Sequence, residues 1–386
     1  MLSVRLLFLI CSCILFGSVV NALKDQDDAA PVNTLLTGRR LASASSWHPS
    51  RYKGRGHEES TSATAMDPVD EPSVAGAESQ AAADVYAPFG YGTSPDEVKQ
   101  SGCTILFVAF FVSKPGGFKR GKGERCNGCH ESPMHITFDS AKITHPGACV
   151  GILTDMETDF TKLKGLSGVH LHRFANVVNR ESIGKPSLMY ERMKTYRAFV
   201  DRAAEHNFNV DIVLLDTDIV IIDNIKELFS KEFDYGLSVR PNDSYPIQGG
   251  VQLVHRSKIK EASKFLQTVE EKWAKAAEVS SRVMSFTGDQ KAYADVVGDV
   301  KSLAKIASKG KFANVNVKAD GNQFNVMLIP ADKYNRTPGG PGSGLKRDQV
   351  KVLHYKGGRK EKMYVSYNAL KKGGLKAVWG LKSISR

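Results

Sequence analysis

A run of apolar residues that ends in two carboxylates constrains the fold of this chain more than any other feature. Residues 210–215 read Val-Asp-Ile-Val-Leu-Leu, the triplet Asp216-Thr217-Asp218 follows, and residues 219–222 are again apolar. A continuous run with β-branched residues is typical of a strand that is buried on both faces of a sheet. Carboxylates in such surroundings are costly unless something neutralises them.

The acidic side chains of the triplet suit a divalent cation. Because side chains alternate along a strand, Asp216 and Asp218 are predicted to share one side, with Thr217 opposite. Paired oxygen ligands suit Mg²⁺ or Mn²⁺, and a metal held in this way typically binds substrate phosphates as well. The alternative is an ordinary strand end with two solvated carboxylates, and the triplet alone leaves both interpretations open.

Apolar strand-like runs alternate with helical patterns from about residue 103 onward. The predicted helices cover residues 187–206, 225–229, 257–277 and 289–297. The predicted strands cover residues 104–110, 149–153, 169–174, 210–215, 233–239, 250–255, 325–330 and 350–355. This alternation indicates an α/β domain with a largely parallel sheet that is covered by helices on both faces.

The first hundred residues have the composition of targeting and linker sequence. Arg5 precedes an apolar run over residues 6–20, and Val20 and Ala22 fit the small-residue cleavage rule, so residues 1–22 are predicted to be a signal peptide. The alternative is an uncleaved membrane anchor. Residues 23–100 are rich in Ala, Ser, Pro and acidic residues and are predicted to be a disordered leader. The folded domain is then residues 101–386, in the secretory pathway: secreted, or in the Golgi lumen or membrane.

The net charge of +12 is unevenly distributed along the chain. Residues 24–100 hold seven Lys or Arg and twelve Asp or Glu, so the predicted folded domain is more basic than the whole chain. A basic domain favours anionic ligands such as phosphates, polyanionic glycans or anionic lipid surfaces. Nucleic acid is not expected as a partner, because the chain has no motif of the known nucleic-acid-binding modules.

Four cysteines remain outside the signal segment, which allows up to two disulfides in an oxidising compartment. Cys103 and Cys149 each precede a predicted strand, and their sulfurs could meet if those strands are parallel neighbours. Cys126 and Cys129 form a Cys-x-x-Cys-His motif with His130. A local disulfide or a zinc clip is favoured there. A haem site is disfavoured because haem needs apolar surroundings and this loop is polar, and a redox pair is a further alternative.

Two Asn-x-Ser/Thr sequons, at Asn242 and Asn335, would become glycosylation sites in the secretory pathway. Such triplets also occur often by chance. They are therefore consistent with the predicted compartment and do not establish it.

Four blocks of the chain, in order, resemble retaining GT-A glycosyltransferases of the glycogenin and lipopolysaccharide galactosyltransferase family. The blocks are residues 211–229, 248–254, 288–290 and 354–360, and the resemblance spans about residues 101–362. It implies a GT-A fold, which is the Rossmann-like nucleotide-diphospho-sugar transferase fold. It also implies a metal-dependent, retaining transferase.

The resemblance implies a metal site and a diphosphate site. Asp216, Asp218 and His354 would hold Mn²⁺, or Mg²⁺, and neutral imidazole suits Mn²⁺ better. Lys360 would approach the diphosphate of a nucleotide-sugar donor, and Gly357 would supply the unusual backbone angles there. Metal and lysine would together offset charge that develops on the leaving nucleotide diphosphate.

The resemblance also implies residues around the sugar and the nucleotide. Asp289 would bind sugar hydroxyls, and Gln290 would stabilise the positive sugar-like transition state or orient the acceptor. Asp155, at a predicted strand end, would meet the base or ribose. Arg192 or Lys194 would reach the diphosphate and the sugar.

The sequence therefore predicts a glycosyltransferase that uses a nucleotide-sugar, expected to be UDP-linked, with a glycan, protein or lipid acceptor. Gln248 replaces the Asn usual in the family, and Glu361-Lys362 replaces a frequent Pro-Trp, so the sugar and the acceptor stay open. One alternative is a non-enzymatic secreted interaction protein on the same scaffold. Another is a sugar nucleotidyltransferase, whose glycine-rich loop residues 116–121 match only in part.

Overall fold

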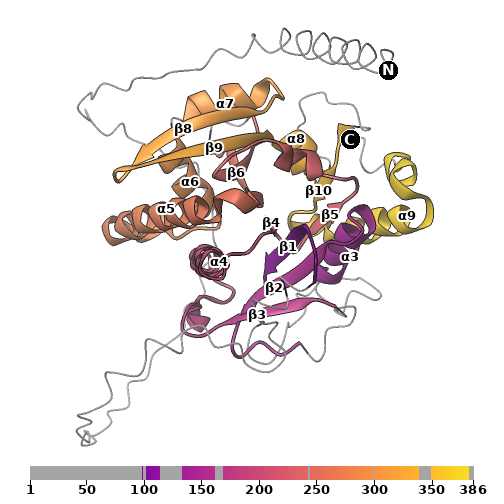
Figure 1. Cartoon of the computed structure of the whole chain (residues 1–386), viewed down its shortest axis with the longest axis horizontal. Helices are drawn as coiled ribbons and strands as arrows, with labels where there is room; N and C mark the ends of the chain where they lie inside the picture. The colour runs from indigo at the N-terminus through magenta and orange to yellow at the C-terminus, as the bar shows by residue number, and fades with distance from the viewer. Residues whose placement is uncertain are drawn as a thin grey trace, which may run out of the picture. The chain divides into compact units, whose positions relative to one another are not determined.

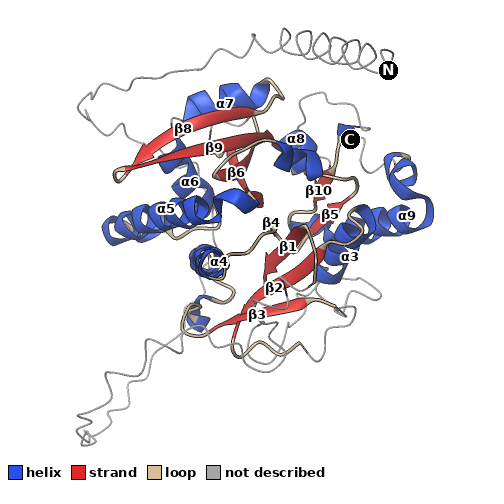
Figure 2. Cartoon of the chain, viewed as in Figure 1, coloured by secondary structure: helices blue, strands red, loops and turns tan. Residues whose placement is uncertain are grey.

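A central mixed sheet organises the part of the chain that the computed structural model describes (Figures 1 and 2). The described residues are 98, 101–113, 133–160, 168–241, 244–298, 300–338 and 349–381. The predicted signal peptide, most of the predicted leader, the Cys126–His130 motif and Asn242 lie outside them. Within these described residues, no helix has the length and apolarity that crossing a bilayer requires.

Eight strands form the main sheet in the order β3-β2-β1-β4-β7-β6-β9-β8. Their bounds are β1 Ile105–Phe110, β2 Cys149–Asp155, β3 His170–Phe174, β4 Asp211–Leu215, β6 Tyr235–Val239, β7 Ile247–Val254, β8 Ala313–Ala319 and β9 Asn322–Pro330. The strands β7 and β8 run antiparallel to their neighbours, and the other six share one direction. The predicted α/β class is confirmed, with a sheet that is mostly parallel but mixed.

Helices cover both faces of this sheet. Alternate residues of a strand point to opposite faces, and each face packs against helices to form its own hydrophobic core. In β1, Leu106 and Val108 pack with the helices α4 (Leu188–Glu205), α5 (Ile259–Val279) and α6 (Gly288–Val297). Phe107 and Ala109 face the other way, toward the helix α3 (Met134–Thr144). Figure 1 shows α4, α5 and α6 together on one side of β1 and α3 on the other.

A second, two-stranded sheet packs beside α3. Its strands are β5 (Ile219–Ile221) and β10 (Val352–His354), which pair antiparallel. The helix α9 (Lys360–Trp379) covers it, and apolar side chains of α3, β5, β10 and α9 share one core. This small sheet brings the C-terminal part of the chain against the end of β4.

The shorter elements complete the connections between these parts. They are the helices α7 (Val300–Ser308) and α8 (Ala331–Tyr334), and the 3₁₀ turns η1 (Arg180–Ser182), η2 (Lys226–Ser230), η3 (Arg256–Lys258), η4 (Ser281–Val283) and η6 (Gly357–Arg359). The sequence pattern did not predict the helices α3, α7, α8 and α9 or the strands β5 and β8. The other predicted elements are present, with ends shifted by a few residues.

The predicted pairing of Cys103 with Cys149 is confirmed by a disulfide whose Cα atoms lie 5.7 Å apart. The bond forms because β1 and β2 are parallel neighbours and each cysteine lies at the start of its strand. The sequon at Asn335 is not an accessible glycosylation site, because this residue is 3% exposed and its amide is hydrogen-bonded inside the protein.

Candidate functional site

The acidic triplet Asp216-Thr217-Asp218 forms the turn between β4 and β5 rather than the end of a strand. Three hydrogen bonds hold this turn. The N–H of its first residue donates to Gly250 O over 3.0 Å, and Thr137 Oγ1 on α3 donates to the central carbonyl over 3.0 Å. Tyr355 N donates to the carbonyl of the third residue over 2.8 Å. The turn is therefore fixed to β7, to α3 and to the residue after β10.

Three potential metal-ligand atoms converge at this turn. His354 Nε2 lies 3.3 Å from Asp216 Oδ2 and 3.0 Å from Asp218 Oδ1. The ligand atoms of these residues all lie within 4.8 Å of one another. The structure thus brings together the three residues that the sequence predicted as metal ligands, two from the β4–β5 turn and one from the end of β10.

A chain of hydrogen bonds starting at a backbone carbonyl determines which nitrogen of His354 carries a proton. Ser238 Oγ donates to Gln248 O over 2.7 Å, so its lone pairs face Asn335 Nδ2, which donates to it over 2.8 Å. Asn335 Oδ1 therefore faces His354, and His354 Nδ1 donates to it over 2.8 Å. The lone pair of Nε2 is left to point at the two carboxylates, as a metal-binding histidine requires.

This donor set fits a divalent cation. Two carboxylate oxygens and an imidazole lone pair that face one another repel, unless a proton or a cation lies between them. One nitrogen and two oxygen ligands suit Mn²⁺, with coordination positions left for phosphate oxygens.

Opposing effects act on the acidity of Asp218. Burial alone would raise its pKa, but when His354 carries a second proton, on Nε2, its hydrogen bond and charge outweigh burial and, together with the charge of Lys360, lower the pKa of the Asp218 carboxyl to about 2. The Nζ atom of Lys360 lies 3.5 Å from Asp218 Oδ2. Asp218 is therefore ionised at neutral pH, as a metal ligand has to be.

Arg192 joins the metal-ligand cluster to Asp289. Its guanidinium forms an ion pair with Asp216 Oδ1 and another, of 2.5 Å, with Asp289 Oδ2. Burial would lower the pKa of Arg192, but the charges of the two carboxylates raise it above its usual value. The other oxygen of Asp216, Oδ2, is the one that faces His354.

Asp289 has one oxygen ready for a ligand. The residue is 2% exposed, and burial raises the pKa of its carboxyl even though Arg192 acts in the opposite direction. Its Oδ1 atom is buried and has no hydrogen-bond partner among the described residues. An unpaired buried carboxylate oxygen is costly, so a hydroxyl donor from a bound molecule would stabilise it.

Two consecutive glycines of β7 make room for these side chains. A Cβ atom on Gly249 would lie 2.3 Å from Asp289 Oδ2, and one on Gly250 would lie 2.4 Å from His354 Cε1. Any larger residue at either position would displace a side chain of the site.

A second hydrogen-bonded chain leads from Lys356 to Gln290. The ammonium group of Lys356 donates to Gln248 Oε1, and Gln248 Nε2 donates to Gln290 Oε1 over 3.2 Å. Burial lowers the pKa of Lys356, although Asp216 acts to raise it. Both predicted catalytic residues lie at the start of α6: Asp289 is joined to the cluster through Arg192, and Gln290 contacts Gln248.

Asp155 ends β2, on the same edge of the sheet as the cluster but two strands away. Its carboxylate is already paired: Oδ1 accepts from Thr158 N over 2.7 Å, and Oδ2 forms an ion pair with Arg180. A nucleotide base or ribose would have to share Asp155 with Arg180.

The structure places Lys194 away from the cluster. About 200° of helix separates it from Arg192, so the two side chains leave opposite sides of α4. Its Nζ atom lies 2.7 Å from Glu191 Oε2 and 5.5 Å from the ring centroid of Tyr190. In contrast, Gly357 has an unusual backbone angle, as the resemblance implied, because its φ of 60° lies in the left-handed region.

Sequence reasoning missed several residues of the site, namely Ser238, Asn335, Lys356, Arg180 and Thr137. Lys356 lies within the block 354–360, and its position two residues after His354 was a signal that it shares the site. Asn335 drew attention only as a sequon. Nothing in the local pattern around Ser238 or Thr137 indicates a partner so far away in the sequence.

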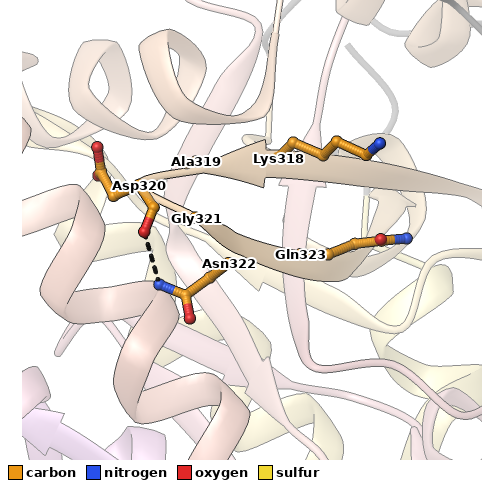
Figure 3. Close-up of a pocket in the computed structure, with 6 residues that line it drawn as sticks. All are labelled: Lys318, Ala319, Asp320, Gly321, Asn322 and Gln323. Carbon is orange, nitrogen blue, oxygen red and sulfur yellow. Dashed lines mark hydrogen bonds between the residues drawn. The ribbon is translucent and has the colours of Figure 1, made fainter.

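A shallow hollow lies elsewhere on the surface, at the β8–β9 hairpin (Figure 3). It is lined by Lys318, Ala319, Asp320, Gly321, Asn322 and Gln323. The dashed line in the figure is the bond from Asn322 Nδ2 to Asp320 O, of 3.2 Å. These residues form a tight turn at the far edge of the sheet from β3, and none of the site residues lines the hollow.

Comparison with known proteins gives similarity only to solved structures. No protein-family model matches the chain, and no curated protein matches it. It is similar to the galactosyltransferase LgtC in complex with donor and acceptor sugar analogs, at 13% identity and a TM-score of 0.37, over 66% of this chain and 88% of that one.

Two further similar structures are also glycosyltransferases. GlyE of Streptococcus pneumoniae TIGR4 has 10% identity and a TM-score of 0.39, over 72% of this chain and 62% of that one. Mouse xyloside xylosyltransferase 1, in its apo form, has 11% identity and a TM-score of 0.37, over 65% of this chain and 97% of that one. At these TM-scores the similarity identifies no function, so the function has to be argued from the side chains of the site.

Proposed function

We propose that this protein is a metal-dependent glycosyltransferase. It would move a sugar from a nucleotide-diphosphate donor, expected to be a UDP-sugar, to a glycan, protein or lipid acceptor. The observation that carries the proposal is the convergence of Asp216 Oδ2, Asp218 Oδ1 and His354 Nε2, with the imidazole lone pair directed inward. Mn²⁺ is the cation that this donor set suits best, and Mg²⁺ is the alternative.

The cationic side chains around the cluster match a diphosphate. Lys360 lies at the mouth of the cluster with its side chain about half exposed, and Lys356 lies deeper. Arg192 is already engaged by two carboxylates and Lys356 donates to Gln248, so of these three side chains Lys360 is the one that is open to an anion. When bound, Mn²⁺ would neutralise the two phosphates and stabilise the charge that develops on the leaving diphosphate.

The chain's own residues supply the remaining functions of a transferase. Lys360 would interact with the leaving phosphate as negative charge grows on it. Asp289 Oδ1 would accept a hydrogen bond from a sugar hydroxyl, which satisfies an otherwise unpaired buried oxygen. Arg192 holds Asp289 and Asp216 at a fixed separation, so the sugar and the diphosphate would bind at a fixed distance from each other.

Calorimetric titration of the purified protein with UDP, with and without Mn²⁺, tests the proposal. Binding of UDP is expected to depend on Mn²⁺ and to disappear when a chelator removes the metal. A screen for hydrolysis across nucleotide sugars then identifies the donor. Absence of metal-dependent binding to any nucleotide diphosphate would favour a non-enzymatic protein on this scaffold.

The substitution Asp218→Asn tests the metal site directly, because it removes one ligand charge and keeps the shape of the side chain. Mn²⁺ affinity is expected to fall by more than about 100-fold, and donor hydrolysis is expected to be lost. Asp320→Asn, on the exposed β8–β9 turn, is the matched control and should bind Mn²⁺ normally. Equal Mn²⁺ affinity in the two variants would contradict the proposed ligand set.

We also propose that the protein works in the secretory pathway. The disulfide between Cys103 and Cys149 supports this location, because disulfides persist in oxidising compartments. Fractionation of cells that produce the tagged full chain tests it, and a cytosolic pool of the protein would contradict it.

A further inference from the structure

The side chain of Lys356 makes its one described hydrogen bond to a neutral amide, although carboxylates are near. Its ammonium donates to Gln248 Oε1, and the charges of Asp216, Asp218 and Asp289 all act on it. Lys360, four residues later, instead lies beside a carboxylate of the cluster. The two lysines therefore have different roles in the site.

The orientation of the Gln248 amide is determined independently at both of its ends. An ammonium group has donors and no acceptor, so the amide oxygen has to face Lys356. At the other end, the two protons of Gln248 Nε2 are shared among three acceptors: Tyr245 O at 3.2 Å, Ile247 O at 3.0 Å and Gln290 Oε1 at 3.2 Å. Gln248 is 2% exposed, so water does not compete strongly for either end.

The fixed amide of Gln248 in turn orients Gln290. Gln248 Nε2 lies 3.2 Å from Gln290, and an N–H group can only donate, so the atom of Gln290 that faces it is the carbonyl Oε1. The NH₂ group of Gln290 then points away from Gln248. Gln290 directly follows Asp289, whose carboxylate has the unpaired oxygen, in the first turn of α6.

We propose that Lys356 and Gln248 are positioning residues that hold Gln290 as a hydrogen-bond donor toward an oxygen of the bound sugar or of the acceptor. This inference rests on the proposed function and adds to it the role of Gln290. Sequence reasoning gave Gln290 the stabilisation of positive charge or the orientation of the acceptor. The geometry favours the second role, because the carbonyl oxygen of Gln290 is already engaged.

The competing interpretation of Lys356 is direct binding of a donor phosphate. The two interpretations differ in whether the effect of Lys356 depends on Gln290. A positioning residue loses its effect once the residue that it positions is removed, whereas a phosphate-binding lysine keeps its effect.

The first experiment needs no activity and uses the unliganded full chain. The side-chain amide signals of Gln248 and Gln290 are assigned by ¹H–¹⁵N NMR with Gln→Glu variants at each position. Lys356→Met is expected to shift the Gln290 signal and to speed solvent exchange of the Gln248 amide protons. Lys362→Met, on the exposed side of α9, is the control and should shift neither signal. An unchanged Gln290 signal in Lys356→Met would overturn the proposal.

The second experiment is a double-mutant cycle on transfer, or on donor hydrolysis if no acceptor is known. Lys356→Met is expected to lower kcat about tenfold or more in the native chain, which is the effect of one charge-assisted hydrogen bond. In a Gln290→Ala background the same substitution should change kcat less than twofold. An undiminished loss in that background, or a loss confined to UDP affinity, would assign Lys356 to phosphate binding instead.

The two experiments separate the failure of this inference from the failure of the proposed function. If the native chain neither binds UDP with Mn²⁺ nor hydrolyses any nucleotide sugar, the proposed function fails, and the NMR result still decides whether Lys356 orients Gln290. If the chain is active and the NMR signals do not respond to Lys356→Met, the inference fails alone.

Discussion

The position of a single proton on His354 decides whether the acidic turn can bind a cation. A hydrogen on Nε2 would turn a ligand into a donor that pairs with Asp216 and Asp218 and closes the site. The structure prevents this in the neutral ring, because Asn335 Oδ1 accepts the proton of Nδ1. The amide of Asn335 is itself oriented by Ser238, whose hydroxyl proton is used on a backbone carbonyl. A fixed backbone atom thus determines the chemistry of a side chain two partners away.

Asn335→Leu tests this orientation, because leucine has a similar size and no hydrogen-bonding group. The imidazole would lose its Nδ1 partner, and Mn²⁺ affinity measured without any donor substrate is expected to fall about 10- to 100-fold. Asn316→Leu, at an exposed position of β8, is the matched control. Native Mn²⁺ affinity in a folded Asn335→Leu variant would show that the tautomer of His354 is set in another way.

The sequence indicated the ligand residues of the site but not the residues that orient them. Asp216 and Asp218 stand out because acidic residues interrupt an apolar run, and His354 stands out within a motif. Asn335 and Ser238 have no such local contrast, since their role depends on the bridge between Arg336 and β10 and on the pairing of β6 with β7. A sequon pattern even gave Asn335 an exposed role that its burial contradicts.

At the scale of elements, the start of β7 brings several site residues together. Its side chain at Gln248 reaches Gln290 and Lys356, while its backbone passes close to His354 and Asp289. A strand can approach side chains this closely only where it has no Cβ atoms. The glycine pair at positions 249 and 250 therefore belongs to the site as much as its charged residues do.

Gly250→Ala is expected to disrupt the metal site with little effect on the rest of the fold. The new Cβ would lie 2.4 Å from His354 Cε1 and 3.1 Å from Asp216 Oδ2, so the imidazole has to move. Mn²⁺ affinity should fall at least about tenfold, comparable to the loss of an orienting partner. Gly380→Ala is a suitable control, because its nearest atom would be 3.4 Å away and its backbone is helical. Tight Mn²⁺ binding by Gly250→Ala would contradict the close packing of β7 on His354.

The elements that the sequence did not reveal are those with weak local patterns. Strand β8 has alternating exposed residues that include Asn and Lys, and its main signal is the Asp320-Gly321 turn, where both residues have positive φ. That dipeptide would have predicted the β8–β9 hairpin. The helix α3 faces two separate cores, so its apolar residues do not form one clear stripe. The helix α9 is interrupted at Gly373 and Gly374, where the backbone is not helical.

At the scale of the whole domain, the site lies at the edge of the main sheet where six of its eight strands have their carboxyl ends. The ends of β2, β4 and β6 and the start of β7 meet at one edge of the sheet, and α4, α6 and β10 add their residues there. Ligands of open α/β sheets bind beyond the carboxyl ends of the strands, and this domain follows that rule. The fold class and the position of the site were predictable for this reason, whereas the side-chain network was not.

Two buried histidines make the stability of the domain depend on pH. Burial lowers the pKa of His172 to about 3 and that of His145 to about 4. His145 Nε2 accepts a hydrogen bond from Ile225 N over 2.9 Å, so a second proton on that ring would oppose an N–H group. His172 Nε2 is buried and has no hydrogen-bond partner among the described residues.

The free energy of unfolding is therefore expected to fall as pH drops below about 6.5, where the unfolded histidines take up protons and the folded ones do not. The loss for each histidine continues down to its folded-state pKa, with a slope of at most about 1.4 kcal/mol per pH unit. Urea unfolding at several pH values between 4 and 7 measures it. His172→Phe removes one such group and an unpaired nitrogen, so its slope should be smaller. An equal slope in that variant would show that His172 is not a source of the pH dependence.

The disulfide between Cys103 and Cys149 should contribute to stability without affecting the site. It closes a loop with a sequence separation of 46 residues, for which chain entropy predicts about 4 kcal/mol. A Cys103→Ala/Cys149→Ala variant is therefore expected to unfold on the order of 10 °C lower than the native chain in a thermal scan. Reductant should lower the Tm of the native chain and leave that of the variant unchanged. Because the bond joins the starts of β1 and β2, at the edge of the sheet opposite the site, Mn²⁺ affinity below the transition should be the same in both proteins. A variant with native Tm and weakened Mn²⁺ binding would reverse this assignment and make the disulfide part of the functional site.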